Sequence, residues 1–297
     1  MRRWQSAALA LLLLPLVLGS AKAEDKLRVG KAIQNSFPFG LLDVGIGSGV
    51  FKQNGFDITP VTFSGAARVQ QALTSNDIDI GLSTGQDMGF ILKGLPAMTI
   101  AALSNAPFES VMVVSWDGPI KQVADLKGKK VAVSNLRGYP RWLVIELSKH
   151  EGWGENGMEL VATGAQPASI AALKTHQVDA WAGDVVPPFM NTAMYATNIL
   201  IQQHPDIVRR FVKAWFENIA WARGQKAETV KLLQPVLNLK PETIGAIYDQ
   251  LMFKQATDGR FDAAAMKTMP RAIVELGILD SEPDVSKLYT EAFLPKR

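Results

Sequence analysis

The sequence predicts an α/β fold made of two similar lobes and a helical C-terminal region. Short apolar segments alternate with segments of helical periodicity as far as Trp181, which is the pattern of parallel strands joined by helices. This alternation restarts once, after a longer apolar segment at 111–116. From His204 onward the pattern is purely helical. These observations together define the fold class.

Residues 1–23 have the three parts of a secretory signal peptide. Arg2 and Arg3 precede a run of apolar residues from Ala7 to Leu18, and the segment closes on the small-x-small pattern Ala21-Lys22-Ala23. The apolar run is shorter than the ~20 residues that a helix needs to cross a bilayer. We therefore expect cleavage after Ala23 and export, without a membrane anchor.

Charge and cysteine content exclude several classes of function. The chain has 31 basic and 28 acidic residues, and removal of 1–23 takes away three basic residues and no acidic one. A mature chain without net charge or basic runs has no electrostatic reason to bind nucleic acid. The chain has no cysteine, so we expect no lipid attachment, no thiolate nucleophile and no cysteine-ligated zinc.

The first α/β section contains short apolar strands separated by helices. The strands are predicted at 27–30, 56–63, 78–82 and 97–103, and the helices at 40–51, 66–74 and 87–93. Gly45, Gly47 and Gly49 fall inside the first of these helices. We interpret them as sites of close packing, because a phosphate-binding loop would lie between a strand and a helix.

The second α/β section follows the same order. Its strands are predicted at 111–116, 130–133, 158–162 and 178–181, and its helices at 139–151 and 168–175. Phe63-Ser64-Gly65 followed by Asp77-Ile78-Asp79 corresponds to Ala162-Thr163-Gly164 followed by Gln177-Val178-Asp179. Two ordinary strand–helix–strand units can match in this way by chance. The same order at the same stage of both sections nevertheless favours two similar lobes.

The last third of the chain is predicted to be helical. Ile207, Phe211, Trp215 and Ile219 recur every four residues and form the apolar stripe of an amphipathic helix. Further helices are predicted at 227–237, 241–253, 263–276 and 285–293. The tryptophans and methionines of these helices are interpreted as core residues.

Residue patterns for catalysis or metal binding are missing from the sequence. His150, His176 and His204 have no second ligand at metal-binding spacing, and the chain has neither a Gly-x-Ser-x-Gly elbow nor a P-loop. We therefore predict no catalytic residue, no metal and no cofactor.

Small polar residues follow the predicted strands. Ligands of open α/β sheets bind beyond the carboxyl ends of the strands, where helix N-termini present unpaired N–H groups. Each such turn could equally do no more than cap its helix. The predicted ligand-binding residues are Asn35, Ser36, Phe37, Ser64, Gly65, Ser83, Thr84, Ser134, Arg137, Gly138, Trp181 and Asp184.

Three of these candidates each have two open interpretations. Arg137 could hold an anionic ligand bidentately or be a solvated surface arginine. Asp184 could bind an ammonium group or pair with a neighbouring base. Trp181 could form a wall of the site or pack in the core.

Several short motifs resemble the solute-binding proteins of ABC importers for nitrate, sulfonates and taurine, a group that includes pyrimidine-precursor binders. The resemblance covers nearly all of the mature chain. It rests on Gly49-Val50-Phe51-Lys52-Gln53-Asn54-Gly55-Phe56-Asp57-Ile58, Ser64-Gly65, the segments 72–81 and 124–133, and Gln203-His204-Pro205-Asp206-Ile207-Val208-Arg209-Arg210-Phe211.

The resemblance implies a type II periplasmic-binding-protein fold, with two lobes joined by a hinge and the ligand in the cleft between them. The implied divisions are the signal at 1–23, lobe 1 at 24–112, lobe 2 at 113–192 and a return to lobe 1 with the C-terminal helices at 193–297. The implied partners are a small-molecule ligand and a permease in the inner membrane. We expect a monomer that is free in the periplasm and not a lipoprotein. Only Phe189–Met194 separate two elements that family members space more widely, which predicts a shortened second lobe or return strand.

Three functions remain open on the sequence. The favoured one is the solute-binding component of an importer for a small anion such as a sulfonate, nitrate or taurine. The second is an enzyme on the same fold, resembling the yeast-type pyrimidine synthase, whose activity is associated with a cysteine-rich motif that this chain does not have. The third is a sensory or interaction module that no longer binds a small molecule.

Overall fold

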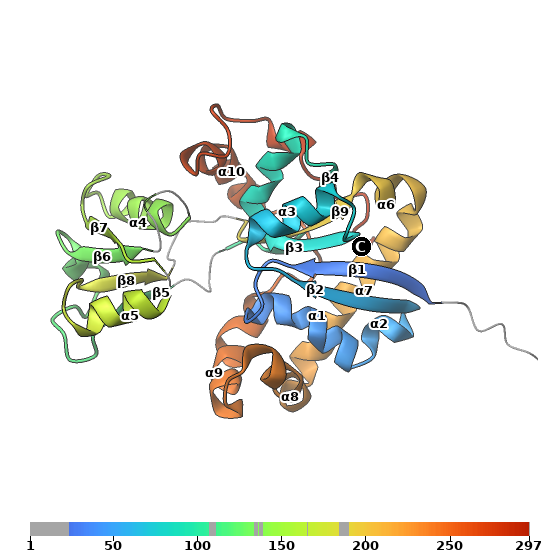
Figure 1. Cartoon of the computed structure of the whole chain (residues 1–297), viewed down its shortest axis with the longest axis horizontal. Coiled ribbons are helices and arrows are strands. Elements are labelled where there is room, and N and C mark those ends of the chain that lie inside the picture. Colours follow the sequence, from blue (N-terminus) through green and yellow to red (C-terminus); the bar gives the residue numbers. More distant parts are fainter. Residues whose placement is uncertain are drawn as a thin grey trace, which may run out of the picture.

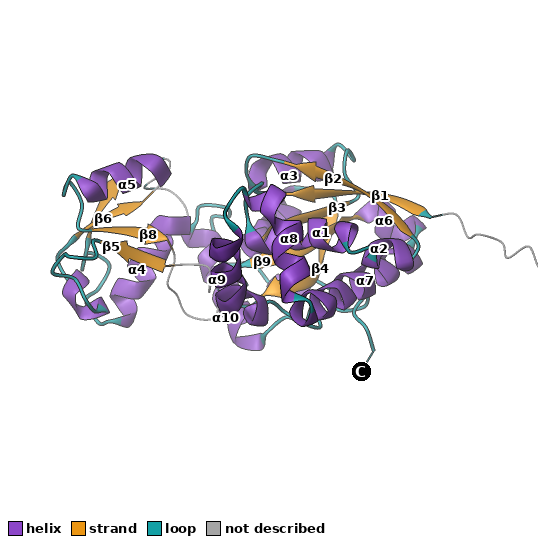
Figure 2. Cartoon of the chain, turned by 90° about the horizontal axis from the view of Figure 1, so that it is seen from below, coloured by secondary structure: helices purple, strands orange, loops and turns teal. Residues whose placement is uncertain are grey.

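The computed structural model describes residues 24–106, 111–133, 136, 139–164, 166–183 and 190–296, so the predicted signal peptide lies outside the described residues. The described strands form two separate sheets, each flanked by helices (Figures 1 and 2). We call the part around the five-stranded sheet the first lobe and the part around the four-stranded sheet the second lobe. The predicted two-lobed α/β fold is confirmed.

The first lobe is built on a mixed sheet with the strand order β2-β1-β3-β9-β4. Strand β1 pairs in parallel with β2 and β3, whereas β9 runs antiparallel between β3 and β4. All six residues of β9 are buried. The strands are β1 (Asp25–Lys31), β2 (Phe56–Thr62), β3 (Ile80–Thr84), β4 (Ala97–Ser104) and β9 (Thr192–Thr197).

Helices cover both faces of this sheet. Helices α1, α8 and α9 lie on one side and α3 and α10 on the other (Figure 1). The elements are α1 (Phe37–Gly47), α2 (Val50–Gln53), α3 (Ala66–Thr74), the 3-10 helix η1 (Gly85–Lys93), α6 (Asn198–Gln203), α7 (Pro205–Gly224), α8 (Lys226–Leu237), α9 (Pro241–Leu251), η3 (Met252–Lys254), α10 (Ala263–Glu275) and η4 (Val285–Lys287). Within the described residues, no helix has the length and apolar character needed to cross a membrane.

The second lobe has the strand order β5-β8-β6-β7. Strand β6 pairs in parallel with β7 and β8, and β5 pairs antiparallel with β8. Its elements are β5 (Val111–Val114), η2 (Val123–Leu126), β6 (Lys130–Val133), α4 (Tyr139–His150), β7 (Glu159–Ala162), α5 (Gln166–Lys174) and β8 (Ala180–Gly183).

The predicted internal repeat is present in atomic detail. Strand β1 pairs in parallel with β2 on one side and β3 on the other, and β6 pairs in the same way with β7 and β8. Asp79 Oδ2 accepts a hydrogen bond from the backbone N–H of Arg28 at 2.7 Å, and Asp179 Oδ2 accepts one from Lys130 at 2.8 Å. Asp79 thus connects the start of β3 to β1, and Asp179 connects the start of β8 to β6. The equivalent pairs show that the sequence match reflects a structural repeat.

Two crossings connect the lobes. The chain passes from β4 to β5 through 105–110 and returns from β8 to β9 through 184–191, so the antiparallel pairs β4–β9 and β5–β8 are joined end to end. Val111 pairs in the second sheet and Thr192 pairs in the first. The return strand β9 is therefore present, and the segment 184–189 lies outside the described residues.

Two predicted helices differ in the structure. The helix predicted at 40–51 is two helices, because Gly49 adopts the left-handed conformation with φ of 79° and separates α1 from α2. At 285–293 only the short η4 forms, and Tyr289 instead makes a bridge with Thr99 of β4. Apolar content alone therefore gave the wrong secondary structure at the C-terminus. The predicted stripe on α7 is confirmed, since Phe211, Trp215 and Ile219 are buried.

Candidate functional site

One edge of the first sheet faces the crossings to the second lobe. Strands β1, β2, β3 and β4 all end at this edge, because β9 runs antiparallel to both of its neighbours. Both crossings also meet the sheet here, one after β4 and one before β9. We call the described segments 32–36, 63–65, 84–86, 105–106 and 190–191 the interlobe edge. Carboxyl ends of strands are the usual ligand-binding position in open α/β sheets.

The interlobe edge carries amide and hydroxyl groups but no charged side chain among its described residues. Asn35 is exposed, and Ser36 is the N-cap residue of α1 without a side-chain capping bond. Gln86 Oε1 is buried and has no hydrogen-bond partner within the described residues. Buried acceptors are normally bonded, so Gln86 presents a free acceptor at this edge.

The remaining candidates of the first lobe have different surroundings. Phe37 is only 5% exposed and belongs to the main hydrophobic core. Gly65 has a φ of 128° and donates its N–H to the carbonyl oxygen of Ala32, which closes the turn beside Ser64. Ser83 is buried, whereas Thr84 is half-buried and lies at the end of β3. The structure therefore brings Ser36, Ser64, Gly65 and Thr84 to the interlobe edge and places Phe37 in the core.

Most candidates of the second lobe lie outside the described residues: Ser134, Arg137, Gly138 and Asp184. Trp181 is half-buried on β8 and packs against the small apolar cluster that contains Leu173 and Val178. These contacts favour the core interpretation of Trp181. Thr163, at the end of β7, bonds the hydroxyl of Ser169 at 2.7 Å and so positions the start of α5.

A buried polar cluster behind the interlobe edge was missed at the sequence level. Asp87 of η1 is 4% exposed, and its Oδ2 accepts a hydrogen bond of 2.5 Å from Ser83 Oγ. The hydroxyl of Tyr195 on β9 donates to the carbonyl oxygens of Thr84 and Gly85. Burial raises the pKa of Asp87 above its ordinary value of 3.8, and hydrogen bonds, first that of Ser83, oppose the rise. The only sequence signal was an aspartate directly before the apolar stretch Met88–Leu92.

Replacing Asp87 by asparagine is expected to stabilise the protein at neutral pH. Asparagine keeps an oxygen that accepts from Ser83 but removes a charge that is buried among neutral groups. A carboxyl whose pKa is raised on folding costs stability once the pH exceeds the unfolded pKa, so the gain should grow upward from about pH 4.

Thermal unfolding at pH 4 and pH 7 measures this gain, which we expect to be on the order of 1–3 kcal/mol at pH 7. Asp57→Asn is the control, since Asp57 is exposed on β2. A loss of stability in Asp87→Asn at pH 7 would show that the ionised carboxylate is favourable in the fold.

The return crossing is fixed tightly to the end of β3. Gly85 donates its N–H to the carbonyl oxygen of Asn191 at 2.9 Å, and Asn191 donates to the carbonyl oxygen of Ser104 at 3.0 Å. A Cβ atom on Gly85 would collide with the carbonyl oxygen of Met190. Glycine is therefore required for the close approach of the two backbones. This packing holds the crossing against the sheet at the interlobe edge.

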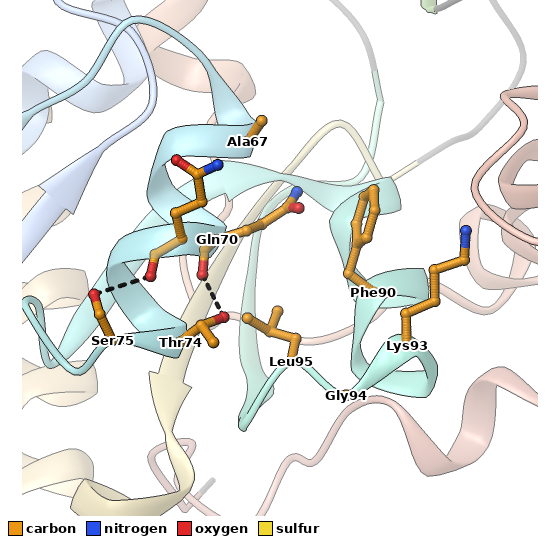
Figure 3. Close-up of a pocket in the computed structure, with 9 residues that line it drawn as sticks. Ala67, Gln70, Thr74, Ser75, Phe90, Lys93, Gly94 and Leu95 are labelled. Carbon is orange, nitrogen blue, oxygen red and sulfur yellow. Dashed lines mark hydrogen bonds between the residues drawn. The ribbon is translucent and has the colours of Figure 1, made fainter.

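A separate cavity of about 480 Å³ lies between α3 and η1 (Figure 3). Gln70 of α3 and Phe90 and Lys93 of η1 line it, with Leu95 beyond the helix. The hydroxyl of Thr74 is satisfied by the carbonyl oxygen of Gln70 at 2.8 Å. None of the lining residues belongs to the segments of the interlobe edge, so the cavity and the edge are two different places on the first lobe.

The geometry supports binding better than catalysis within the described residues. The histidines lie at helix ends: His150 closes α4, His176 follows α5 and His204 separates α6 from α7. The buried pair of Ser83 and Asp87 has no histidine among the groups that shift the pKa of Asp87, so this pair is not part of a Ser–His–Asp arrangement. No group of three potential metal-ligating side chains occurs in the described part of the chain.

Comparison with known proteins gives two kinds of similarity. Residues 41–186, about half of the chain, match the family model described as NMT1/THI5 like. The 4-amino-5-hydroxymethyl-2-methylpyrimidine phosphate synthase THI11 of Saccharomyces cerevisiae is 29% identical over 105 residues, which cover 35% of this chain. The match spans only 30% of the yeast protein. A Haemophilus influenzae protein whose name refers to thiamine biosynthesis is 27% identical over 224 residues, covering 69% of this chain and 71% of that protein.

Structural similarity extends over both lobes. The periplasmic aliphatic sulphonate binding protein SsuA of Escherichia coli superimposes with a TM-score of 0.73 and 19% sequence identity, covering 90% of this chain and 92% of SsuA. Identity at this level supports the fold and not the ligand. The resemblance inferred from the sequence motifs is confirmed by both comparisons. The chain belongs to the NMT1/THI5-like family and has the fold of the periplasmic binding proteins.

Proposed function

We propose that this protein is the periplasmic solute-binding component of an ABC importer. It captures a small solute between its lobes and delivers it to a permease in the inner membrane, working as a free monomer. The observation that carries the proposal is the interlobe edge, which has polar turns without charge, a free buried acceptor on Gln86 and both crossings to the second lobe. The fold shared with a sulphonate-binding protein supports the same function.

Uncharged polar turns in the first lobe, together with the predicted ligand residue Arg137 in the second, favour an anionic solute with a neutral polar part. Amide and hydroxyl groups of the first lobe would bind the neutral part by hydrogen bonds. The predicted ligand residue Arg137 would supply the positive charge from the second lobe, since an arginine fork matches the oxygens of a sulfonate or carboxylate. Nitrate and taurine-like sulfonates fall within this class.

An enzyme acting on a pyrimidine precursor is the second candidate. The partial match to the yeast synthase favours it. Two features weigh against it: the chain has no cysteine, and the histidines of the described residues lie away from the interlobe edge. A pyrimidine that binds without being changed would fit the importer function equally well.

Thermal unfolding of residues 24–297 with a panel of solutes tests the proposal. The panel contains taurine, ethanesulfonate, nitrate, benzoate and 4-amino-5-hydroxymethyl-2-methylpyrimidine. A solute at 100 times its dissociation constant should add about 2.7 kcal/mol of stability. Mass spectrometry of the recovered solute distinguishes binding from turnover. Stabilisation with unchanged solute supports a binding protein, turnover supports the enzyme, and no stabilisation contradicts both.

Arg137→Ala is expected to remove the stabilisation by an anionic solute. Loss of a bidentate charged contact should reduce affinity by roughly tenfold to a hundredfold, while the melting temperature without solute stays unchanged. Arg141→Ala is the matched control, because Arg141 lines a different groove with Glu155. An unaltered solute response in Arg137→Ala would exclude Arg137 from the site.

A further inference from the structure

Helix α4 of the second lobe contacts helix α10 of the first lobe. Trp142 of α4 is 2% exposed, and its indole N–H donates to the carboxylate of Glu275 at the end of α10. Trp142 and Leu143 both pack into the main hydrophobic core, whose other members come from the first lobe. This contact is independent of the two crossings. It therefore ties the lobes together at a third place.

An ion-pair network surrounds the contact. Arg271 of α10 bonds Glu146 of α4, and Lys149 of α4 lies 3.6 Å from Glu275 of α10. Lys149 also lies 3.4 Å from Glu146 and 2.9 Å from Glu155 on its own lobe. The pKa of Lys149 is raised, first by its hydrogen bond to Glu155 and also by Glu275 and Glu146. Each of the two helices thus contributes one cation and one carboxylate to the contact between the lobes, Arg271 and Glu275 from α10 and Lys149 and Glu146 from α4.

Glu146 has its hydrogen-bonded cation, Arg271, on the other lobe, and Lys149 of its own helix lies farther away, at 3.4 Å. The side chain of Glu146 is 5% exposed, whereas that of Arg271 is 43% exposed. A buried carboxylate is strongly destabilised when its cation is removed, because the lost attraction no longer offsets its desolvation. Separating α4 from α10 must therefore either hydrate Glu146 or leave it without a strong partner. The pair favours the lobe arrangement in which α4 and α10 touch.

We propose that Trp142, Glu146, Arg271 and Glu275 form an interlobe latch that sets the width of the cleft. Because α4 belongs to the second lobe and α10 to the first, any rotation of one lobe relative to the other moves α4 along or away from α10. The latch stabilises one arrangement and breaks whenever the cleft changes width. The role of the latch in solute access rests on the proposed function. The contact between the lobes is independent of that function.

The absence of cysteine makes the latch directly measurable. Lys174 on α5 and Lys240 before α9 are both exposed and can each be replaced by cysteine. The two introduced cysteines would be the only thiols, because the chain has none of its own. Spin labels attached to the two cysteines report the distance between the lobes, measured label to label by pulsed electron paramagnetic resonance. The measurement is made on residues 24–297 without solute, so a failure to bind any solute contradicts the proposed function and leaves the latch test intact.

Arg271→Gln and Glu146→Gln are each expected to widen the interlobe distance distribution. We expect roughly a fivefold or greater rise in the population outside the main distance peak. The double variant should be no wider than either single variant, because both remove the same pair. Lys226→Gln is the matched control, since it breaks an ion pair of 2.7 Å with Asp249 inside the first lobe.

Trp142→Phe keeps an aromatic ring in the core but removes the N–H donor to Glu275 and part of the buried indole. It gives a second variant if Arg271→Gln folds poorly. Circular dichroism establishes that each variant is folded. Widening in Trp142→Phe and Arg271→Gln, with the control unchanged, supports the latch. Distributions that stay the same in both variants, or that widen equally in Lys226→Gln, overturn it.

Discussion

Gly85→Ala is expected to destabilise the protein by about 3 kcal/mol or more. This value is the upper end of the usual cost of adding a methyl group where the surrounding atoms leave no space. The added Cβ would collide with the backbone of Met190, and backbone cannot rotate away as the end of a flexible side chain can. The hydrogen bond from the Gly85 N–H to Asn191 would then be lost. Chemical denaturation measures the change. Because Met190 and Asn191 belong to the return crossing, we also expect a wider interlobe distance distribution.

Gly224→Ala is the matched control for Gly85→Ala. Gly224 is the last residue of α7, and a Cβ added there would meet no atom within 4 Å. Alanine in a helix is favoured over glycine by roughly 0.5–1 kcal/mol, so this variant should be neutral or slightly more stable. Equal effects of the two substitutions would show that the close approach at Gly85 is not what requires glycine.

Phe211→Ala is expected to lower the free energy of unfolding by about 3–5 kcal/mol, the usual cost of removing a buried aromatic ring. Phe211 is fully buried on α7, with its ring stacked on Phe51 at 5.4 Å and edge-on to Phe56 at 5.8 Å. The ring therefore joins α2, β2 and α7. Its loss leaves a cavity that three elements must close together.

Phe253→Ala and Phe211→Leu are the controls for this prediction. Phe253 is 63% exposed, so its removal should cost less than about 1 kcal/mol. Phe211→Leu keeps most of the apolar volume and should cost clearly less than the alanine variant. A Phe211→Ala protein as stable as the parent would mean that the first lobe repacks around the cavity.

The two-lobed fold was predictable because its signal is local and repeated. Short apolar strands alternate with helices in both sections, and Asp79 and Asp179 lie at equivalent positions. Strand β9 carries no such signal. Thr192–Thr197 pair antiparallel with two strands that are far away in the sequence, and burial of every residue removes the alternation that marks a half-exposed strand.

The interlobe edge was predictable in outline, because it follows from where strands end. Ser36, Ser64, Gly65 and Thr84 were identified by that rule, whereas Phe37 is a core residue. Asp87 was missed because burial of a carboxylate depends on tertiary packing. The contact between α4 and α10 was missed for the same reason, since Glu146 and Arg271 are 125 positions apart in the sequence.

Hydrogen exchange measured by mass spectrometry, with and without each panel solute, tests solute binding at the interlobe edge most directly. For a solute that stabilises the chain, we predict slower exchange at 32–36, 63–65 and 84–86 together with segments of the second lobe. The cavity between α3 and η1 should show no separate protection. Protection confined to that cavity or to one lobe, or a panel in which no solute slows exchange anywhere, would contradict solute capture between the lobes.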